Sequence, residues 1–529
     1  MSAHDHAVIG AGHNGLIHAC YLARAGLKVV VIERRPVVGG AVCTEEIIPG
    51  YRFDVGSSVH LMFRMTPILD ELGLAAHGLE YIEMDPWAYH PVEGAEGGVT
   101  FYRSVERTCE SIARFSPRDA EAYARFVDHW REINEGVFEV FLKPPTGGAI
   151  LGTMLRRNLL RPASRKLWSS ADTVRMLMGS YGDLIERTFE SGPVRAAMIW
   201  LAAQSGPAPA EMATGDFAGW QAMIHQHGSW RARGGSGSLS VALASKLRSL
   251  GGEILVDAPV QRIARAVNGS FEIETGAGVV EARKVTAACH VHTTFLELLD
   301  PDLCPPELRV RVSQTRIGNG FGMIVRHAVS ELPRYAGQPV DARGVSPVHS
   351  SMQLLCPSRA YLEAALRDHA AGRPPTNPAV LAMTFSAIDP TLAPPGKHTL
   401  FTWAQYHPYE LRNGEGWDAI AEREADKLYE VVCRYAPNMR GRMEGRFIQT
   451  PLDIERRLGL LRGNVMHLEM AFDQMFAFRP LPELSTYRTP IPGLYLTGAS
   501  THPGGGVFGA SGRNAAGVVL KDLGRKLAN

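Results

Sequence analysis

The hydrophobic pattern is clearest at the start of the chain. A short apolar run covers residues 7–9, an amphipathic segment leads to Gly26, and a second β-branched run covers residues 29–32. This order predicts a strand, a helix and a second strand, which is the βαβ unit of nucleotide-binding proteins. The glycines between the first strand and the helix are spaced as Gly10-x-Gly12-x-x-Gly15.

Helical spacing of apolar residues dominates from about residue 61 to 230. It predicts helices at 67–74, 117–137, 171–189 and 193–203. Farther along, the pattern predicts a helix at 241–250, a strand at 253–256, a hairpin at 270–281 and a buried strand at 284–289. A strand at 399–406, a helix at 417–435, a strand at 493–498 and a helix from 513 to the end complete the expected elements.

Composition narrows the class of protein. At 529 residues the chain needs two or three domains, and a net charge of +1 gives no overall field that would attract nucleic acid. The seven cysteines include no CxxC pair, which suits a reducing compartment and argues against a disulfide scaffold or a metal site. No apolar run approaches the roughly 20 residues that span a bilayer. We therefore expect a cytoplasmic protein.

One stretch has two interpretations, one of which is a peripheral contact with a membrane. Residues 154–161 and 165–168 combine basic and apolar side chains, which can lie on an anionic membrane surface. The alternative is a solvated helix whose apolar side faces the core.

The glycine turn carries the first chemical signal. Its three glycines permit a tight turn, a close approach to a pyrophosphate and close helix–strand packing, while the helix N-terminus offers free N–H groups. Glu33, eighteen residues after Gly15, stands where a carboxylate accepts hydrogen bonds from an adenosine ribose. The alternatives are a glycine-rich turn in another α/β protein and a solvated carboxylate.

The C-terminal forty residues carry the second signal. A strand ending at Gly498 is followed by a glycine cluster at 504–512 and a helix. Backbone N–H groups and the helix dipole at such a start can stabilise negative charge on a reduced flavin. A phosphate or a substrate carboxylate could use the same arrangement. With neither a cysteine pair nor a second βαβ unit, the sequence indicates tightly held FAD rather than diffusible NAD.

With these motifs the sequence resembles the phytoene-dehydrogenase-like branch of the FAD-dependent amine oxidase superfamily. Its pattern is similar to the pyridine nucleotide-disulfide oxidoreductase domain-containing protein 2 group and to carotenoid ketolases of desaturase type. Matching segments include 8–33, 234–263, 389–398, 450–455 and 493–516, with a specific Pro-Gly-Gly-Gly-Val motif at 503–507. The missing cysteine pair argues against disulfide reduction.

The resemblance implies an α/β fold with a Rossmann-like FAD-binding domain of the glutathione-reductase-2 type, an inserted α+β substrate domain and a helical lid. We expect the FAD-binding domain at 1–60, 231–295 and 481–529, the substrate domain at 61–115 and 296–480, and a helical subdomain at 116–230. The residues expected to contact FAD are Gly10, Gly12, Gly15, Glu33, Arg34, Gly39, Gly40, Ser57, Val260, Gly498, Gly505, Gly506 and Val507.

The catalytic side chains are the least specified part. His60 and His502 are expected to flank the flavin and to polarise substrate or accept a proton, or else to be structural hydrogen-bonding residues. Trp403, Tyr406 and His407 are candidates for a cavity wall, with core packing as the alternative.

The expected reaction is hydride removal from a C–H bond of an apolar, carotenoid- or isoprenoid-like substrate. Oxygen, a quinone or NAD(P) are the alternative electron acceptors, and the oligomeric state is open. Two other functions remain: an amine or other small-molecule oxidase, and a flavin-binding interaction protein with little turnover.

Overall fold

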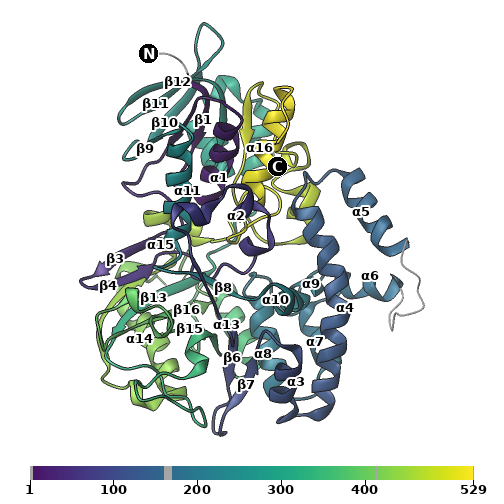
Figure 1. The fold of residues 1–529 in the computed structure, drawn as a ribbon, viewed down its shortest axis with the longest axis vertical. Helices are drawn as coiled ribbons and strands as arrows, with labels where there is room; N and C mark the ends of the chain where they lie inside the picture. The colour runs from purple at the N-terminus through teal and green to yellow at the C-terminus, as the bar shows by residue number, and fades with distance from the viewer. Residues whose placement is uncertain (1–3, 160–169, 413, 528–529) are drawn as a thin grey trace.

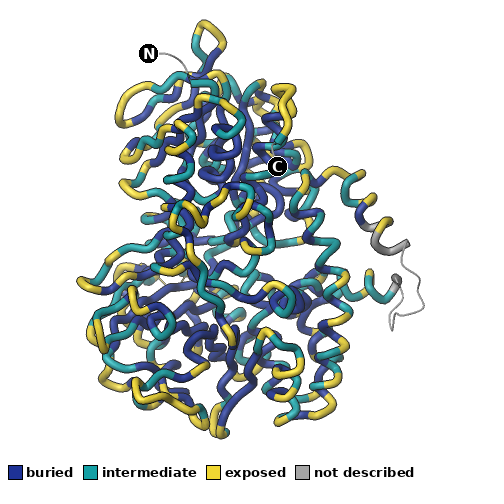
Figure 2. Tube along the Cα trace, in the orientation of Figure 1, coloured by how far each residue is buried: buried dark blue, intermediate teal, exposed yellow. Residues whose placement is uncertain are grey.

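The computed structural model describes residues 4–159, 170–412 and 414–527. Two seven-stranded sheets form the framework, one in the upper and one in the lower half of Figure 1. Buried residues concentrate within both halves in Figure 2.

The first sheet contains the predicted βαβ unit. Its central strand β1 (His4–Ile9) pairs in parallel with β2 (Val29–Ile32) and with β12 (Gly278–Ala287), which in turn pairs in parallel with β18 (Leu494–Leu496). The carboxyl ends of these four strands therefore lie along one edge. The other strands are β9 (Glu253–Leu255), β10 (Val260–Arg265) and β11 (Phe271–Thr275).

Three helices cover the first sheet. Helix α1 (His13–Arg24) follows the glycine turn and packs against α16 (Ala510–Asp522) and α11 (Gly237–Ser249). The first and last helices of the chain are thus neighbours (Figure 1).

The second sheet has the order β17-β13-β16-β15-β14-β6-β7. All neighbours in it are antiparallel except β14 and β6. Its strands are β6 (Ala88–Pro91), β7 (Gly98–Phe101), β13 (Gly322–Val329), β14 (Met352–Leu355), β15 (Ala379–Met383), β16 (His398–Gln405) and β17 (Met443–Gln449). Helix α14 (Trp417–Tyr435) packs its apolar side against β13, β15 and β16.

The helices from α3 to α10 form a lateral block, most of it beside the second sheet (Figure 1). They are α3 (Val105–Ala113), α4 (Pro117–Phe141), α5 (Gly147–Leu159), α6 (Ser170–Met178), α7 (Tyr181–Thr188), α8 (Gly192–Ala203), α9 (Gly215–Gly219) and α10 (Gln221–His227). Helices α5 and α6 project from the body in Figure 1. No helix in the described ranges is long and apolar enough to cross a membrane. Most of the basic and apolar stretch at 154–168 lies outside the described residues, so its membrane contact stays a prediction.

The structure differs from the helical prediction in two places. The single helix expected at 171–189 is two helices, α6 and α7, because Ser180 starts a new helix by accepting a hydrogen bond from the Asp183 N–H at 3.2 Å. Within the region where helical spacing dominates, the segment at 81–101, for which no helix is predicted, forms strands β5 (Tyr81–Glu83), β6 and β7. Strands β6 and β7 are buried along their whole length, so they lack the alternation that marks a half-exposed strand.

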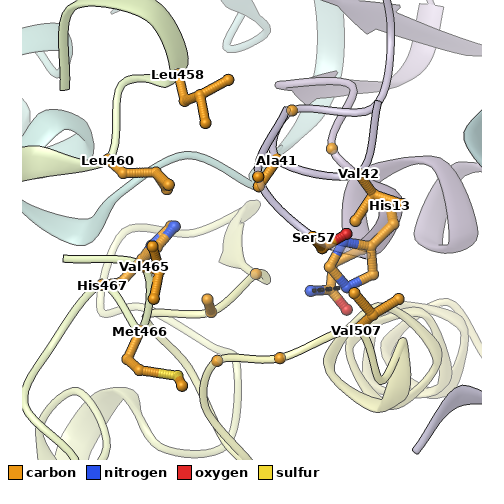
Figure 3. A pocket seen from close by; sticks show the side chains of 18 of the residues that line it. His13, Ala41, Val42, Ser57, Leu458, Leu460, Val465, Met466, His467 and Val507 are labelled. Carbon is orange, nitrogen blue, oxygen red and sulfur yellow. Dashed lines mark hydrogen bonds between the residues drawn. The ribbon is translucent and has the colours of Figure 1, made fainter. Parts of the chain in front are cut away.

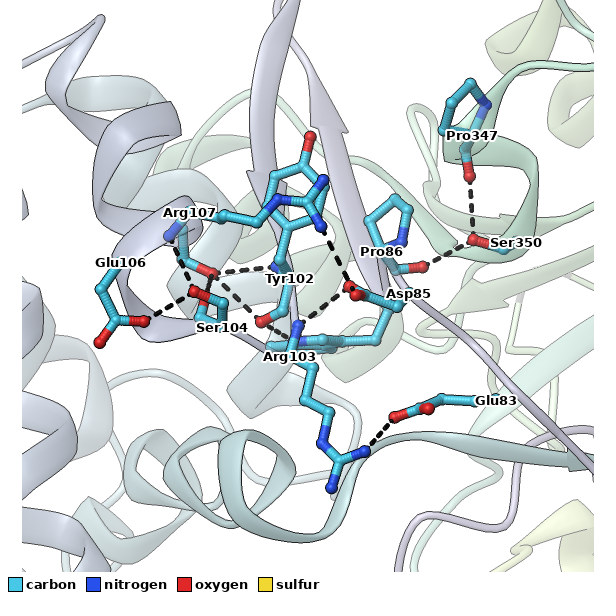
Figure 4. A network of polar contacts seen from close by, with 12 residues as sticks. Glu83, Asp85, Pro86, Tyr102, Arg103, Ser104, Glu106, Arg107, Pro347 and Ser350 are labelled. Carbon is cyan, nitrogen blue, oxygen red and sulfur yellow. Dashed lines mark hydrogen bonds and ion pairs between the residues drawn. The ribbon is translucent and has the colours of Figure 1, made fainter.

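A polar network joins β7 to α3 (Figure 4). Ser104 caps α3 by accepting from the Arg107 N–H at 3.1 Å and donates to Glu106 at 2.7 Å. The Arg103 N–H donates to Asp85 at 3.0 Å, which fixes the turn before β6. The helical block is therefore attached to the edge of the second sheet. The predicted three-part division of the chain stays a prediction.

A buried ion pair holds the segment after β4 (Tyr51–Asp54). Arg231 in β8 (Trp230–Ala232) donates to Asp54 at 2.6 Å, with side-chain exposures of 2% and 3%. Asp54 also accepts from the Ser236 N–H at 2.7 Å, and Arg231 donates to the Ser58 carbonyl at 3.1 Å. These bonds tie residues 54–58 to the turn that starts α11.

Replacing Asp54 by Ala should destabilise the fold strongly. The change leaves the Arg231 guanidinium buried without its carboxylate, which costs about 3–5 kcal/mol. Urea unfolding of the apoprotein measures the loss. The matched control is Arg118→Ala, whose ion pair with Glu190 is exposed and should change stability by less than about 1 kcal/mol. Equal effects of the two substitutions would contradict the prediction.

Candidate functional site

One cavity of about 990 Å³ is lined by both glycine-rich segments that the sequence singled out, the turn at 10–15 and the C-terminal segment at 498–507. It is lined by the glycine turn after β1, the end of β2, the loop after β18 and the wall of the second sheet. All residues predicted to contact FAD line it: Gly10, Gly12, Gly15, Glu33, Arg34, Gly39, Gly40, Ser57, Val260, Gly498, Gly505, Gly506 and Val507. Figure 3 shows part of this lining, including His13, Ser57 and Val507 close together.

The glycine turn has the shape that a dinucleotide requires. A Cβ on Gly15 would lie 2.2 Å from the Gly10 carbonyl oxygen, so only glycine lets α1 approach β1 this closely. A Cβ on Gly12 would meet nothing within 4 Å, so this position faces open space in the cavity. The first turn of α1 has no side-chain cap and no acidic residue. Its N–H groups and positive dipole end are therefore available to phosphate oxygens.

Glu33 is a buried carboxylate at the end of β2. It is 6% exposed and lines the cavity, so the alternative of a solvated carboxylate is wrong. Its oxygens accept from the Ala11 N–H at 2.8 Å and the Arg35 N–H at 3.0 Å. These bonds fix the carboxylate beside the glycine turn, which is the placement that a ribose-binding acid needs.

The segment before α16 forms a second part of the cavity lining, in addition to the glycine turn. Gly505, Gly506 and Val507 line the cavity just before the helix, whose first turn carries no acidic residue. The helix N-terminus therefore presents positive dipole charge near this lining. The His13 ring lies against the Gly506 backbone, so the C-terminal segment meets the N-terminal glycine turn.

His60 does not line the cavity. It is fully buried, and its two ring nitrogens share hydrogen bonds with the hydroxyls of Tyr81 and Ser236, both at 2.8 Å. Burial, with smaller contributions from His13 and Arg231, lowers its pKa to about 3. The imidazole is neutral and both of its nitrogens already have hydrogen-bond partners. The structure therefore favours the alternative that His60 is a structural hydrogen-bonding residue.

His502 is likewise absent from the lining. Its ring is fully buried against Phe141, and Nε2 donates to the Val140 carbonyl at 3.2 Å. Burial lowers its pKa to about 4. In this structure His60 and His502 pack and hydrogen-bond away from the cavity lining, and their expected catalytic role stays a prediction.

Other polar side chains line the cavity instead. His13, Cys289, His290 and His467 face it, and none of them was among the predicted site residues. His13 lies inside the Gly10–Gly15 motif, which was the available signal for it, whereas His467 has no sequence motif around it. Of the wall candidates, Trp403 lines the cavity, while Tyr406 and His407 are buried in the core away from it.

The half of the cavity next to the second sheet is apolar. Its wall comes from strands of the second sheet, from α8 to α10 and from the loop after α15 (Pro451–Leu458). The apolar lining includes Val59, Leu61, Trp87, Phe141, Leu201, Phe217, Trp220, Ile224, Phe321, Leu381, Phe401, Trp403, Leu460, Val465 and Phe508. Methionines add to it: Met62, Met65, Met352, Met383, Met466, Met470 and Met475.

The fold and the cavity are those of a dinucleotide-dependent enzyme with a large apolar pocket. Residues 15–325 match the family described as flavin containing amine oxidoreductase. The chain belongs to this family and is an FAD-dependent oxidoreductase, which confirms the predicted family, fold class and cofactor.

Relatives and solved structures agree with this assignment. The pyridine nucleotide-disulfide oxidoreductase domain-containing protein 2 of Rattus norvegicus is 34% identical, with 98% of this chain and 94% of the relative covered. The lycopene-forming phytoene desaturase of Pantoea ananas is 27% identical, with 98% and 99% covered. An oxidoreductase structure from Methanosarcina mazei has a TM-score of 0.61 at 16% identity, with 98% and 99% covered, and shows the fold alone.

The buried neutral state of His60 should appear in the pH dependence of stability. Below pH 6.5 the unfolded chain binds a proton at this residue, but the folded chain does not until about pH 3. Stability is therefore lost as pH falls, by about 2 kcal/mol for this group between pH 7.5 and 5. In His60→Gln the loss of urea-unfolding free energy over that interval should be smaller by this amount. The same pH dependence in both proteins would refute the assignment.

Proposed function

We propose that this enzyme removes a hydride from a C–H bond of a large apolar substrate of isoprenoid or carotenoid type. The observation that carries the proposal is the division of one cavity into a polar half with a glycine turn and an apolar half. When bound in the polar half, FAD supplies the two-electron acceptor for this oxidation.

The residues of the chain have separate tasks in this proposal. Gly10, Gly12 and Gly15 approach the pyrophosphate, and Glu33 accepts from the adenosine ribose, with Arg34 and Val260 beside the adenine. Gly39 and Gly40 line the ribityl path, and the turn with Ser57 passes beneath the flavin ring. The loop from Gly498 to Val507 and the start of α16 lie at the flavin edge, where the helix dipole favours negative charge.

The apolar wall supports a hydrocarbon-like substrate. Aromatic side chains such as Trp87, Phe321 and Trp403 give it broad rigid surfaces, and methionines such as Met352 and Met470 adapt to irregular shapes. Burial in such a wall excludes water from the reacting carbon. The named activities of the relatives, which include phytoene desaturase and limonene dehydrogenase, support the same substrate class.

The charged lining residues argue against an amine substrate. They are Glu33, Arg34, Arg35, Glu297, Glu455 and Arg456. Glu297 and Glu33 both act electrostatically on Cys289, which places Glu297 near the nucleotide end. Glu455 already accepts from Tyr409 Oη at 3.0 Å. An ammonium group would therefore enter an apolar wall without a carboxylate partner, which is costly.

Anaerobic reduction distinguishes the substrate classes. Carotenoid or monoterpene delivered in detergent micelles should bleach the visible flavin absorbance of the holoenzyme, and putrescine should leave it unchanged. Bleaching by the amine alone would refute the proposal. Dithionite reduction of the same sample is the control that the bound flavin is competent.

The proposed FAD placement predicts different effects at two neighbouring glycines. Gly12→Ala adds a methyl group to open cavity space, so the apoprotein should keep wild-type thermal stability while its Kd for FAD rises about tenfold or more. Gly15→Ala forces a clash with the Gly10 carbonyl and should destabilise the apoprotein itself. Calorimetry and flavin fluorescence titration measure the two quantities. Unchanged FAD affinity in Gly12→Ala would contradict the placement.

A further inference from the structure

His467 is one of the polar side chains of the cavity that the proposed function leaves without a task. It follows Met466 in the loop after α15 and lines the cavity. Its backbone has φ +66°, a left-handed conformation that is uncommon for a residue other than glycine and that occurs often at ligand sites. The ring stacks on that of His290 with centroids 5.1 Å apart.

Hydrogen bonds fix the orientation and the tautomer of this ring. His467 Nδ1 lies 2.9 Å from Ser500 Oγ, which also accepts from the Val291 N–H at 3.1 Å. Donation from the Ser500 hydroxyl to Nδ1 gives this buried O–H group its acceptor, so the ring proton lies on Nε2. Among the described residues, Nε2 has no hydrogen-bond partner. The arrangement leaves one N–H donor for a ligand in the cavity.

The loop that carries His467 is held rigidly by Arg479. This arginine is fully buried and donates to the carbonyls of Met466 at 2.6 Å, Ala499 at 2.8 Å and Gln474 at 3.1 Å. Within the described part of the chain its hydrogen bonds go to backbone carbonyls and none to a carboxylate, and burial lowers its pKa to about 9. Its positive charge therefore remains uncompensated close to the cavity and favours an anion there.

His467 lies across the cavity from the glycine turn. Figure 3 shows His467 and Met466 on one side and His13, Ser57 and Val507 on the other. Met466 packs against Gly505, where an added Cβ would lie 2.5 Å from its sulfur, and His13 is close enough to lower the pKa of His467. These contacts place His467 near the part of the cavity where α1 begins.

We propose that His467 is a cofactor-binding residue that donates its Nε2–H to a pyrophosphate oxygen of FAD. The loop at 466–475 then covers the cofactor from the side opposite α1, and Ser500 and Arg479 are positioning residues for this contact. The inference rests on the proposed placement of FAD beside Gly12. A neutral imidazole suits this task, because it offers a directed donor at low cost of desolvation.

Titrations of the apoprotein with FAD and with ADP test the contact. ADP carries the pyrophosphate without the flavin or ribityl chain, so a true pyrophosphate contact affects both ligands. In His467→Ala the Kd for each should rise about 10- to 100-fold. His467→Gln, which retains a side-chain N–H donor, should stay within a few-fold of wild type. The matched control His292→Ala removes a neighbouring histidine that does not line the cavity, and it should bind both ligands normally.

Several results would overturn the inference. They are wild-type ADP affinity in His467→Ala, an effect on FAD alone, or an equal loss in His292→Ala. If Gly12→Ala weakens FAD binding and His467→Ala does not, the FAD placement stands and this inference fails; if neither weakens it, both fail. If His467→Ala does not fold, Ser500→Ala is the deciding variant. It removes the hydrogen bond that orients the His467 ring, so the Kd for ADP should rise about fivefold, and an unchanged Kd would refute the contact.

Discussion

Close backbone contact between the two ends of the chain is the constraint on which the structure depends. Helix α1 approaches β1 at Gly15, and α16 approaches α1 at Gly512, where a Cβ would lie 2.3 Å from the Asn14 carbonyl oxygen. Any larger residue at either position separates the elements. Because β18 also pairs with β12 beside β1, the first and last segments of the chain share one sheet edge. The polar half of the cavity is formed by this shared edge.

Buried arginines stabilise the remaining walls in a different way. Arg231 is paired with Asp54, whereas Arg479 is surrounded by backbone carbonyls, and Arg326 donates to the Asp54 carbonyl at 2.6 Å. Removing such charges from water is expensive, so their net contribution to stability is modest even where every bond is made. Their main contribution is to hold backbone segments in place. Each one fixes irregular backbone next to the cavity that no sheet or helix would hold.

Local motifs could be predicted from the sequence, and contacts between distant segments could not. The glycine turn and Glu33 depend on spacing within about thirty residues, and the helix at Trp417–Tyr435 has the bounds that its pattern predicts. The strands near residue 90 are short and fully buried, so apolar and polar residues do not alternate along them and the sequence carries no strand signal there. His60 and His502 stand beside motif residues in sequence, but their hydrogen-bond partners Ser236 and Val140 lie far along the chain. No rule based on residue spacing predicts that Ser236 and Val140 hydrogen-bond to these rings. Nor does any such rule predict that His467 lines the cavity.

The same distinction explains how one cavity combines a defined cofactor half with an adaptable substrate half. Hydrogen bonding to phosphate and ribose needs backbone N–H groups at fixed positions, which only a few glycines and one carboxylate can supply. Contact with an apolar molecule needs only area and shape, which many combinations of Leu, Met and aromatic residues provide. In the proposed arrangement, the polar end orients the cofactor and the apolar end accepts a substrate through its hydrocarbon surface. The junction of the two halves, between Ser57, Val507 and the loop of His467, is where a reacting carbon meets the flavin in the proposed arrangement.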